Sequence, residues 1–286
     1  MRSTKWDLPY RLEEIREMTS DSSRNQLVVK SNALIQRAKF NLTMMEQRIV
    51  VFLISKIKPG DTGLEQYYFS FKEFCNVCGI ELDAGNTYDY LRDALKHLSD
   101  KSIWIDAEWD RDGKHYTGQT LVRWVNDIEV SEVSSAVWIE FHKKMLPYLF
   151  QLRDKFTQYQ LRNVLAMNST YAAALYELLK SYEYLERPID FSLEELKFML
   201  GADDVKSYDM YNNFKRKVID KAVSEINTYS DLNVEYKPMK RGKKVTRIIF
   251  AFRRKDSAEE QAQMLVNQEH RFNPGQLPGQ ISMSNL

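Results

Sequence analysis

The chain has 286 residues, of which 43% are hydrophobic and 28% are charged, and its formal net charge at pH 7 is +1. This length favours two domains, and the composition excludes a wholly disordered chain. The sequence contains no apolar run of about 18 residues and no secretory signal pattern, so we expect a cytoplasmic protein without a membrane partner.

The small net charge hides an uneven distribution along the chain. Residues 1–150 carry −2, residues 151–255 carry +6 and residues 256–286 carry −3. Residues 206–255 alone contain 14 lysines and arginines against 5 aspartates and glutamates. A local excess of this size predicts a surface that meets a polyanion, and nucleic acid is the leading candidate.

The first half of the chain predicts a series of helices followed by a hairpin. Residues 1–26 combine a short helical pattern with the polar stretch "TSDSSRN", and we treat them as a loosely attached N-terminal arm. An amphipathic helical pattern starts near Asn41, and a short helix in residues 69–80 and a second helix in residues 86–98 follow. The turn sequence "DRDGKH" at 110–115 then predicts a β-hairpin.

The same series recurs in the second half at an offset of 122 residues. "FSFKEFCNVCGI" parallels "FSLEELKFMLGA", and capping-box spacing is present both in Ser70 with Glu73 and in Ser192 with Glu195. A second helix and a hairpin around "KPMKRGKK" again follow. Helix, short helix, turn, second helix and hairpin in this order describe a winged helix, which is a helix-turn-helix variant. We therefore predict an α+β fold with two tandem winged-helix domains.

We place the two domains at residues 27–150 and residues 151–255. The join near residues 148–158 contains no Pro/Gly-rich linker, so we expect the domains to pack closely. After the second domain the sequence includes "NPGQLPGQISMSN", and we expect residues 256–286 to form a disordered tail.

The second helix of the second unit, "YNNFKRKVIDKAVSEIN", separates apolar from cationic residues. At 100° per residue, one half of the helix collects the residues expected to face the core, namely Phe214, Val218, Ile219, Ala222, Val223 and Ile226. In a helix-turn-helix the second helix enters the major groove, where Arg can bond guanine and Asn can bond adenine. The predicted DNA-binding residues are Asn212, Asn213, Lys215, Arg216, Lys217 and Lys221 on the helix and Lys237, Lys240, Arg241, Lys243 and Lys244 on the hairpin.

A run such as "FKRK" can also be an ordinary solvated helix face. A basic second helix next to a basic wing is a more specific pattern, and it favours DNA contact. The first unit lacks this pattern, because Arg92 and Lys96 on its second helix are balanced by Asp89 and Asp93. We therefore expect the second unit to do most of the sequence reading, and the first to serve dimerisation, partner contact or weaker DNA contact.

These residues resemble a known family, the bacterial plasmid replication initiators that bind repeated origin sequences called iterons. The resemblance covers about residues 27–254. Its most specific stretches are "NALIQRAKFNLTMMEQRIVVFLISKI", "YAAALYELLKSY", "FSLEELKFMLG" and "YNNFKRKVIDKAVSEIN". The arm and the tail carry no stretch that resembles the family.

The resemblance implies two winged-helix domains, with the main iteron contacts made by a helix corresponding to Asn212–Lys221. It also implies that monomers bind double-stranded iteron DNA and open the origin, whereas homodimers formed through the N-terminal domain repress the initiator's own promoter. A host replication initiator and the replicative helicase are the further partners that it implies.

An enzymatic interpretation finds little support in the sequence, and we expect no catalytic residue, metal site or cofactor. Rolling-circle nicking enzymes need a His-x-His pair, and the four histidines never lie two residues apart. No GxxxxGK[ST] phosphate loop is present. The pair Cys75 and Cys78 could be redox-active or supply half a zinc site, but no second ligand pair accompanies it, so two buried thiols are the simpler interpretation.

A transcriptional repressor with two winged helices and no initiator role remains an alternative. Charge and helix pattern fit it equally well. The two functions differ in their DNA, because an initiator requires several direct repeats of about 20 base pairs and a simple repressor requires one inverted operator.

Overall fold

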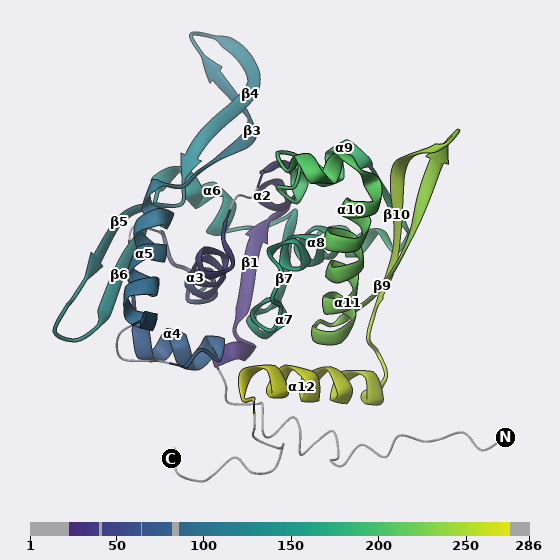
Figure 1. Ribbon diagram of the computed structural model, residues 1–286. Helices are drawn as coiled ribbons and strands as arrows, with labels where there is room; N and C mark the ends of the chain where they lie inside the picture. Colours follow the sequence, from purple (N-terminus) through teal and green to yellow (C-terminus); the bar gives the residue numbers. More distant parts are fainter. Residues whose placement is uncertain (1–22, 40–41, 64, 82–85, 275–286) are drawn as a thin grey trace.

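The computed structural model describes residues 23–39, 42–63, 65–81 and 86–274 (Figure 1). The predicted short helical pattern before residue 23 lies outside the described residues. The part of the arm that is described begins with the 3-10 turn η1 (Ser23–Asn25), whose Arg24 guanidinium donates to the carbonyl oxygens of Asn76 and Val77. This end of the arm is therefore attached to the first unit, which corrects the expectation of a loose arm for these residues.

The first unit contains the predicted series of helices, and its core helix is almost wholly buried (Figure 1). In chain order its elements are β1 (Leu27–Ser31), α2 (Asn32–Arg37), α3 (Met44–Ser55), β2 (Tyr67–Ser70), α4 (Phe71–Cys78), α5 (Asn86–Asp100), β3 (Ser102–Arg111), β4 (Lys114–Arg123), β5 (Val125–Val130), β6 (Ala136–Phe141), η2 (Lys143–Met145) and α6 (Leu146–Leu149). The core helix α3 starts at a complete capping box, in which Thr43 and Glu46 each accept a hydrogen bond from the other's main-chain N–H.

The second unit repeats helix, short helix, second helix and hairpin (Figure 1). Its elements are β7 (Phe156–Gln160), α7 (Leu161–Leu165), α8 (Thr170–Lys180), η3 (Glu183–Leu185), β8 (Ile189–Ser192), α9 (Leu193–Met199), η4 (Lys206–Asp209), α10 (Tyr211–Phe214), the π turn η5 (Lys215–Ile219), α11 (Asp220–Tyr229), β9 (Leu232–Arg241) and β10 (Lys244–Arg254). The predicted order of elements is confirmed in both units.

The two units differ in how the hairpin joins the sheet. In the second unit the hairpin β9–β10 pairs directly with the strand before the short helix, in the order β8-β10-β9. In the first unit the equivalent sheet is β2-β6-β5, and the predicted hairpin β3–β4 forms a separate two-stranded ribbon that projects from the body (Figure 1). The hairpin around "DRDGKH" is thus an insertion, and β5–β6 occupies the place of the wing.

The capping boxes also differ between the units. Ser192 and Glu195 make both reciprocal hydrogen bonds. Ser70 accepts the main-chain N–H of Glu73, whereas the carboxylate of Glu73 pairs with Lys56 at 2.6 Å. The predicted capping box of Ser192 and Glu195 is therefore complete. For Ser70 and Glu73, only one of the two reciprocal hydrogen bonds is present among the described contacts.

The two units share one hydrophobic core, as the missing linker predicted. Strand β1 of the first unit pairs antiparallel with β7 of the second. Behind this pair the ammonium of Lys30 lies 2.7 Å from the carboxylate of Glu177, and both side chains are buried. At another point of contact, Lys39 pairs with Asp203 and Asp204. Strand pairing, one buried charge pair and the more exposed contacts of Lys39 thus fix one unit against the other.

The expectation of a disordered tail is wrong for Ala258–Phe272, which form the helix α12 (Figure 1). Ser257 caps the helix by accepting the main-chain N–H of Glu260, and Met264 and Leu265 are buried. The helix lies across both units, because Glu260 near its start pairs with Arg253 of β10, while Phe272 at its end lies against Gly79 of the first unit. The Pro/Gly-rich stretch that suggested disorder begins only after this helix.

Candidate nucleic-acid interface

The cationic helix predicted for the second unit is one continuous helical segment made of α10, η5 and α11. The residues predicted to face the core do so: Phe214, Val218, Ile219, Ala222 and Ile226 are buried, and Val223 is half-buried against the same core. The opposite side of the segment is left to solvent. The segment therefore has the two-faced character that the apolar spacing predicted.

Four of the predicted helix residues are exposed on this outer side, namely Asn212, Arg216, Lys217 and Lys221. Within the described part of the chain, Arg216, Lys217 and Lys221 form no ion pair and no side-chain hydrogen bond. Their positive charges are consequently not neutralised by the protein. Unpaired cations on a helix whose other face is fixed in the core can meet an anionic partner without breaking internal contacts.

Two predicted helix residues are instead engaged within the protein. The amide nitrogen of Asn213 donates to the main-chain oxygen of Ser207 at 3.0 Å. The ammonium of Lys215 contacts both carboxylate oxygens of Asp220, at 2.8 and 3.1 Å. The helical wheel places Asn213 on the outer face and Lys215 nearer the boundary, and it shows neither of these local partners.

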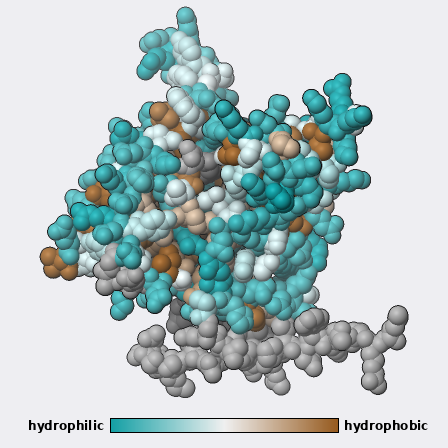
Figure 2. Space-filling view, in the orientation of Figure 1, coloured by the Kyte–Doolittle hydropathy of each residue, from teal (hydrophilic) through white to brown (hydrophobic). Residues whose placement is uncertain are grey.

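The hairpin β9–β10 carries the other predicted cations near its turn. Lys237, Lys240, Arg241, Lys243 and Lys244 are all exposed, and none of them forms an ion pair with a residue that the structure describes. Figure 2 shows a hydrophilic surface over the tip of this hairpin and over the helix beside it. The predicted wing residues are thus brought together at one projecting point.

Strand register distributes these wing cations over both faces of the hairpin. Lys240 shares a face with Val234 and Tyr236, which pack toward the helix, whereas Arg241 lies on the opposite face. Arg241 stands directly across from Lys244. Like charges opposite one another destabilise a hairpin, so a bound polyanion would relieve a repulsion that the free protein contains.

The remaining cations of residues 206–255 divide into two groups. Lys206 is exposed just ahead of the helix, is outside the predicted set, and is an additional candidate. The others are engaged internally: Arg247 of β10 pairs with Asp190, Arg253 with Glu260 and Arg254 with Glu183, and Lys255 is buried. The excess charge that does not pair internally is therefore concentrated on the outer helix face and the wing tip.

The first unit provides an internal comparison. On α5, Arg92 pairs with Glu132 at 3.4 Å, and the ribbon turn brings His115 within 3.0 Å of Asp110. On α5 and at the turn of the inserted ribbon, Arg92 and His115 thus lie beside acidic side chains. The division of work between the units stays a prediction.

The two cysteines lie in the short helix of the first unit. Both lie on α4 as free, buried thiols, and burial raises the pKa of Cys75 to about 11 and that of Cys78 to about 12. A thiol held in its protonated form is a poor nucleophile and a poor metal ligand. Among the described residues no cluster of His, Cys, Asp and Glu could hold a metal ion.

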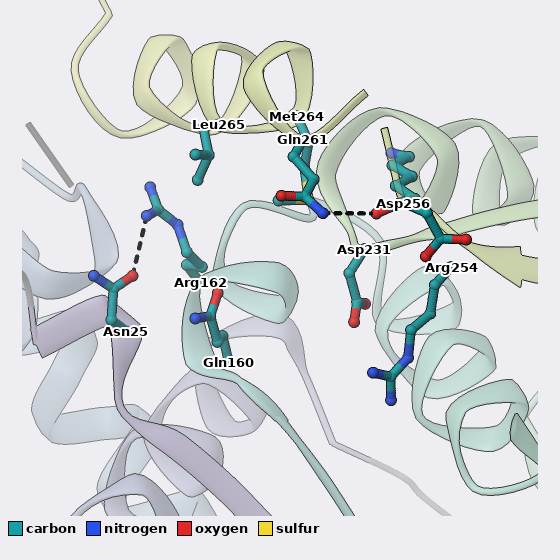
Figure 3. Close-up of a pocket in the computed structure, with 10 residues that line it drawn as sticks. Asn25, Gln160, Arg162, Asp231, Arg254, Asp256, Gln261, Met264 and Leu265 are labelled. Carbon is teal, nitrogen blue, oxygen red and sulfur yellow. Dashed lines mark hydrogen bonds between the residues drawn. The ribbon is translucent and has the colours of Figure 1, made fainter. Parts of the chain in front are cut away.

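A cavity of about 520 Å³ lies between α7, the end of β10 and α12 (Figure 3). Its charged lining is committed to internal contacts: Arg162 donates to Asn25 and pairs with Glu269 of α12 at 2.6 Å, and Arg254 pairs with Glu183. We interpret this cavity as part of the packing of α12. No helix among the described residues is long and apolar enough to cross a membrane.

Comparison with known protein families decides the class of this fold. Residues 27–180 match the family model described as "Initiator Replication protein, WH1", and residues 192–252 match the model described as "Initiator Rep protein, WH2". The chain belongs to the initiator replication protein family. The predicted α+β fold with two tandem winged-helix domains is thereby confirmed, and the family is one of DNA-binding initiators.

Solved structures similar to this initiator include the Pi initiator protein in complex with iteron DNA. The match has a TM-score of 0.65 at 20% identity and covers 82% of this chain and 99% of that one, so the likeness is one of fold. The WH1 domain of a replication protein isolated from a multiple sclerosis patient matches with a TM-score of 0.32 at 21% identity, over 41% of this chain and 86% of that one. Domains 2 and 3 of RctB match with a TM-score of 0.44 at 13% identity, over 72% of this chain and 79% of that one.

Proposed function

We propose that this initiator binds double-stranded DNA at the direct repeats, or iterons, of a plasmid origin. The helix α10–α11 would lie in the major groove, where Arg216 and Asn212 reach base edges, and the tip of β9–β10 would contact the backbone or the minor groove. The observation that carries this proposal is the unpaired charge of Arg216, Lys217 and Lys221 beside an equally unpaired wing tip. The Pi initiator, which has a similar fold, is known in a complex with iteron DNA.

The predicted division of the chain gives the two domains different tasks. Residues 151–255 form the main DNA-binding domain, and residues 27–150 serve dimerisation, partner contact or weaker DNA contact. In this account monomers bind the iterons and promote opening of the origin, and homodimers repress the initiator's own promoter. A host replication initiator and the replicative helicase are the expected partners in the cytoplasm. The protein acts by binding, without a catalytic centre or cofactor of its own.

Fluorescence anisotropy with duplexes taken from the DNA that flanks the coding sequence tests this function. Three duplexes are compared at several salt concentrations: one with the direct repeats, one with a single inverted site and one with a scrambled sequence. The proposal predicts tighter binding to the direct repeats than to either of the others. Tight binding to an inverted site alone would favour a repressor without an initiator role.

The residue-level part of the proposal requires a matched control. Arg216→Ala removes an unpaired cation from the helix, and Lys72→Ala removes an exposed cation from α4 of the first unit. Only the first change should weaken binding to the repeats. Equal losses from both changes would argue that overall charge, and not this helix, governs binding.

A further inference from the structure

Lys215 and Asp220 form an ion pair between residues that an ordinary α-helix would separate. Five residues at 100° each place two side chains about 140° apart around an α-helix. Here the segment Lys215–Ile219 is a π turn, with main-chain hydrogen bonds from residue i to residue i+5, so the two side chains come nearly into line. The ammonium of Lys215 is therefore able to contact both oxygens of Asp220, at 2.8 and 3.1 Å.

The same carboxylate also receives a hydrogen bond from the wing. The hydroxyl of Tyr236, on the helix-facing side of β9, donates to Asp220 Oδ1 at 2.5 Å. Figure 1 shows α11 beside β9, and the two elements are in direct contact. Asp220 thus joins the π turn of the helix to the strand that carries the wing.

This arrangement engages the ammonium of Lys215, which the sequence analysis predicts to contact DNA. Hydrogen bonding to Asp220 and Tyr236 raises the pKa of Lys215, so the lysine stays protonated and its charge is directed at Asp220. Asp220 is the one acidic residue between Asn212 and Lys221. An unpaired carboxylate in that segment would repel phosphate, and Lys215 neutralises it.

We propose that Lys215, Asp220 and Tyr236 are positioning residues, which fix the π turn and the wing in the one relative arrangement that fits a cognate DNA site. The inference rests on the proposed function. Arg216 and Lys217 lie within the π turn, so its geometry sets the directions in which they point. Three of the wing cations, Lys237, Lys240 and Arg241, follow Tyr236 on the same strand.

Preorganisation of this kind affects specific binding more than non-specific binding. A bidentate contact to a base edge depends on fixed direction and distance, whereas attraction to phosphate depends mainly on the number of charges. Loosening the link between helix and wing should therefore lower affinity for the cognate repeat and leave affinity for random duplex nearly unchanged.

The test compares Tyr236→Phe and the double variant Lys215→Met/Asp220→Asn with Lys217→Met, which removes the neighbouring unpaired cation. Affinities for the direct repeat and for a random duplex are measured across a range of salt concentrations, with urea unfolding of each variant as a check on folding. Tyr236→Phe removes one hydrogen bond and should weaken cognate binding about two- to tenfold, with random duplex and salt slope unchanged. The double variant Lys215→Met/Asp220→Asn, which removes the ion pair without leaving an unpaired carboxylate, should behave in the same way.

Lys217→Met should change affinity and salt dependence in a different way from these variants. It should weaken both duplexes and reduce the salt slope by about one, as expected for a lost phosphate contact. If the double variant reduces the slope as Lys217→Met does, Lys215 is a phosphate contact and the positioning role is wrong. An unchanged ratio of cognate to random affinity in Tyr236→Phe would also overturn the inference. Wild-type protein that does not prefer the repeats to random duplex refutes the proposed function itself, and the inference with it.

Discussion

Gly79, which ends α4, lies against the main chain of Phe272 at the end of α12. A Cβ atom at Gly79 would be 2.8 Å from both the Cα and the carbonyl oxygen of Phe272. Gly79 also has a φ of +62°, a left-handed conformation that glycine adopts without strain. The glycine therefore allows both the left-handed conformation that ends α4 and the close contact with α12, the helix that crosses the two units.

Substitution of Gly79 should destabilise the fold through both effects. We expect Gly79→Ala to lower the free energy of unfolding by about 3 kcal/mol, because left-handed strain adds to a clash with main-chain atoms. Gly113 is a matched control, since its φ is +71° and no atom lies within 4 Å of an added Cβ. Gly113→Ala should cost only about 1 to 2 kcal/mol. Urea titration measures both changes in the free energy of unfolding. Equal losses for the two variants would mean that the contact of Gly79 with Phe272 does not restrict this position.

Arg216 should contribute to sequence reading. If its guanidinium bonds a guanine, Arg216→Ala will cost about 1 to 3 kcal/mol on the cognate repeat and relax the preference at one base position. Anisotropy titrations against a set of single-base variants of the repeat measure this loss. An equal loss on random DNA would contradict base reading by this residue.

The wing should contribute similarly to the binding of cognate and of random duplex DNA. Lys243 and Lys244 are unpaired at the turn of the hairpin, where they can reach phosphates. Changing both to alanine should weaken cognate and random duplexes to a similar degree and flatten the salt dependence by about one slope unit for each lost phosphate contact. A salt slope identical to that of the wild type would remove the wing from the interface.

Lys255 should make stability depend on pH in the mildly alkaline range. Its ammonium is buried and donates to the main-chain oxygens of Asn227 and Ser230, and burial lowers its pKa to about 8. The unfolded chain keeps the same proton up to about pH 10.4. Between these values the unfolded state binds more protons, so the contribution of this group to stability rises with pH.

The pH effect is measured against Lys255→Met, which lacks the titrating group. From pH 8 to pH 9 the wild type should gain about 1 kcal/mol in free energy of unfolding relative to the variant. Urea titration at the two pH values gives this difference. A difference that stays constant would mean that Lys255 remains protonated in the folded protein.

Local sequence patterns predicted much of the fold. The spacing of Ser192 and Glu195 correctly marked a helix start, and the alternation of apolar residues correctly placed Phe214 and Ile226 in the core. The order of strands in the first sheet could not be read in the same way. Pairing of β6 with β2 joins residues far apart in sequence, and the nearer hairpin β3–β4 has equally good turn residues.

The tail and the site show why single positions are harder to predict. Ser257 and Glu260 have the spacing of a helix start, but the Pro/Gly-rich end of the tail dominated the expectation. Asn213 lies toward the outer side of an ideal wheel, yet a turn carbonyl holds it, and Lys215, nearer the boundary, is held by Asp220. The π turn that makes the second contact possible breaks the regular period on which the wheel depends.

Methylation interference on a duplex repeat tests the central claim most directly, because methylation of guanine N7 blocks contacts in the major groove. Wild-type protein, Arg216→Ala and the control Lys72→Ala are compared on the same labelled DNA. The account predicts that interference at one guanine disappears in Arg216→Ala and persists in Lys72→Ala. An interference pattern that is identical for all three proteins would contradict the placement of this helix in the major groove.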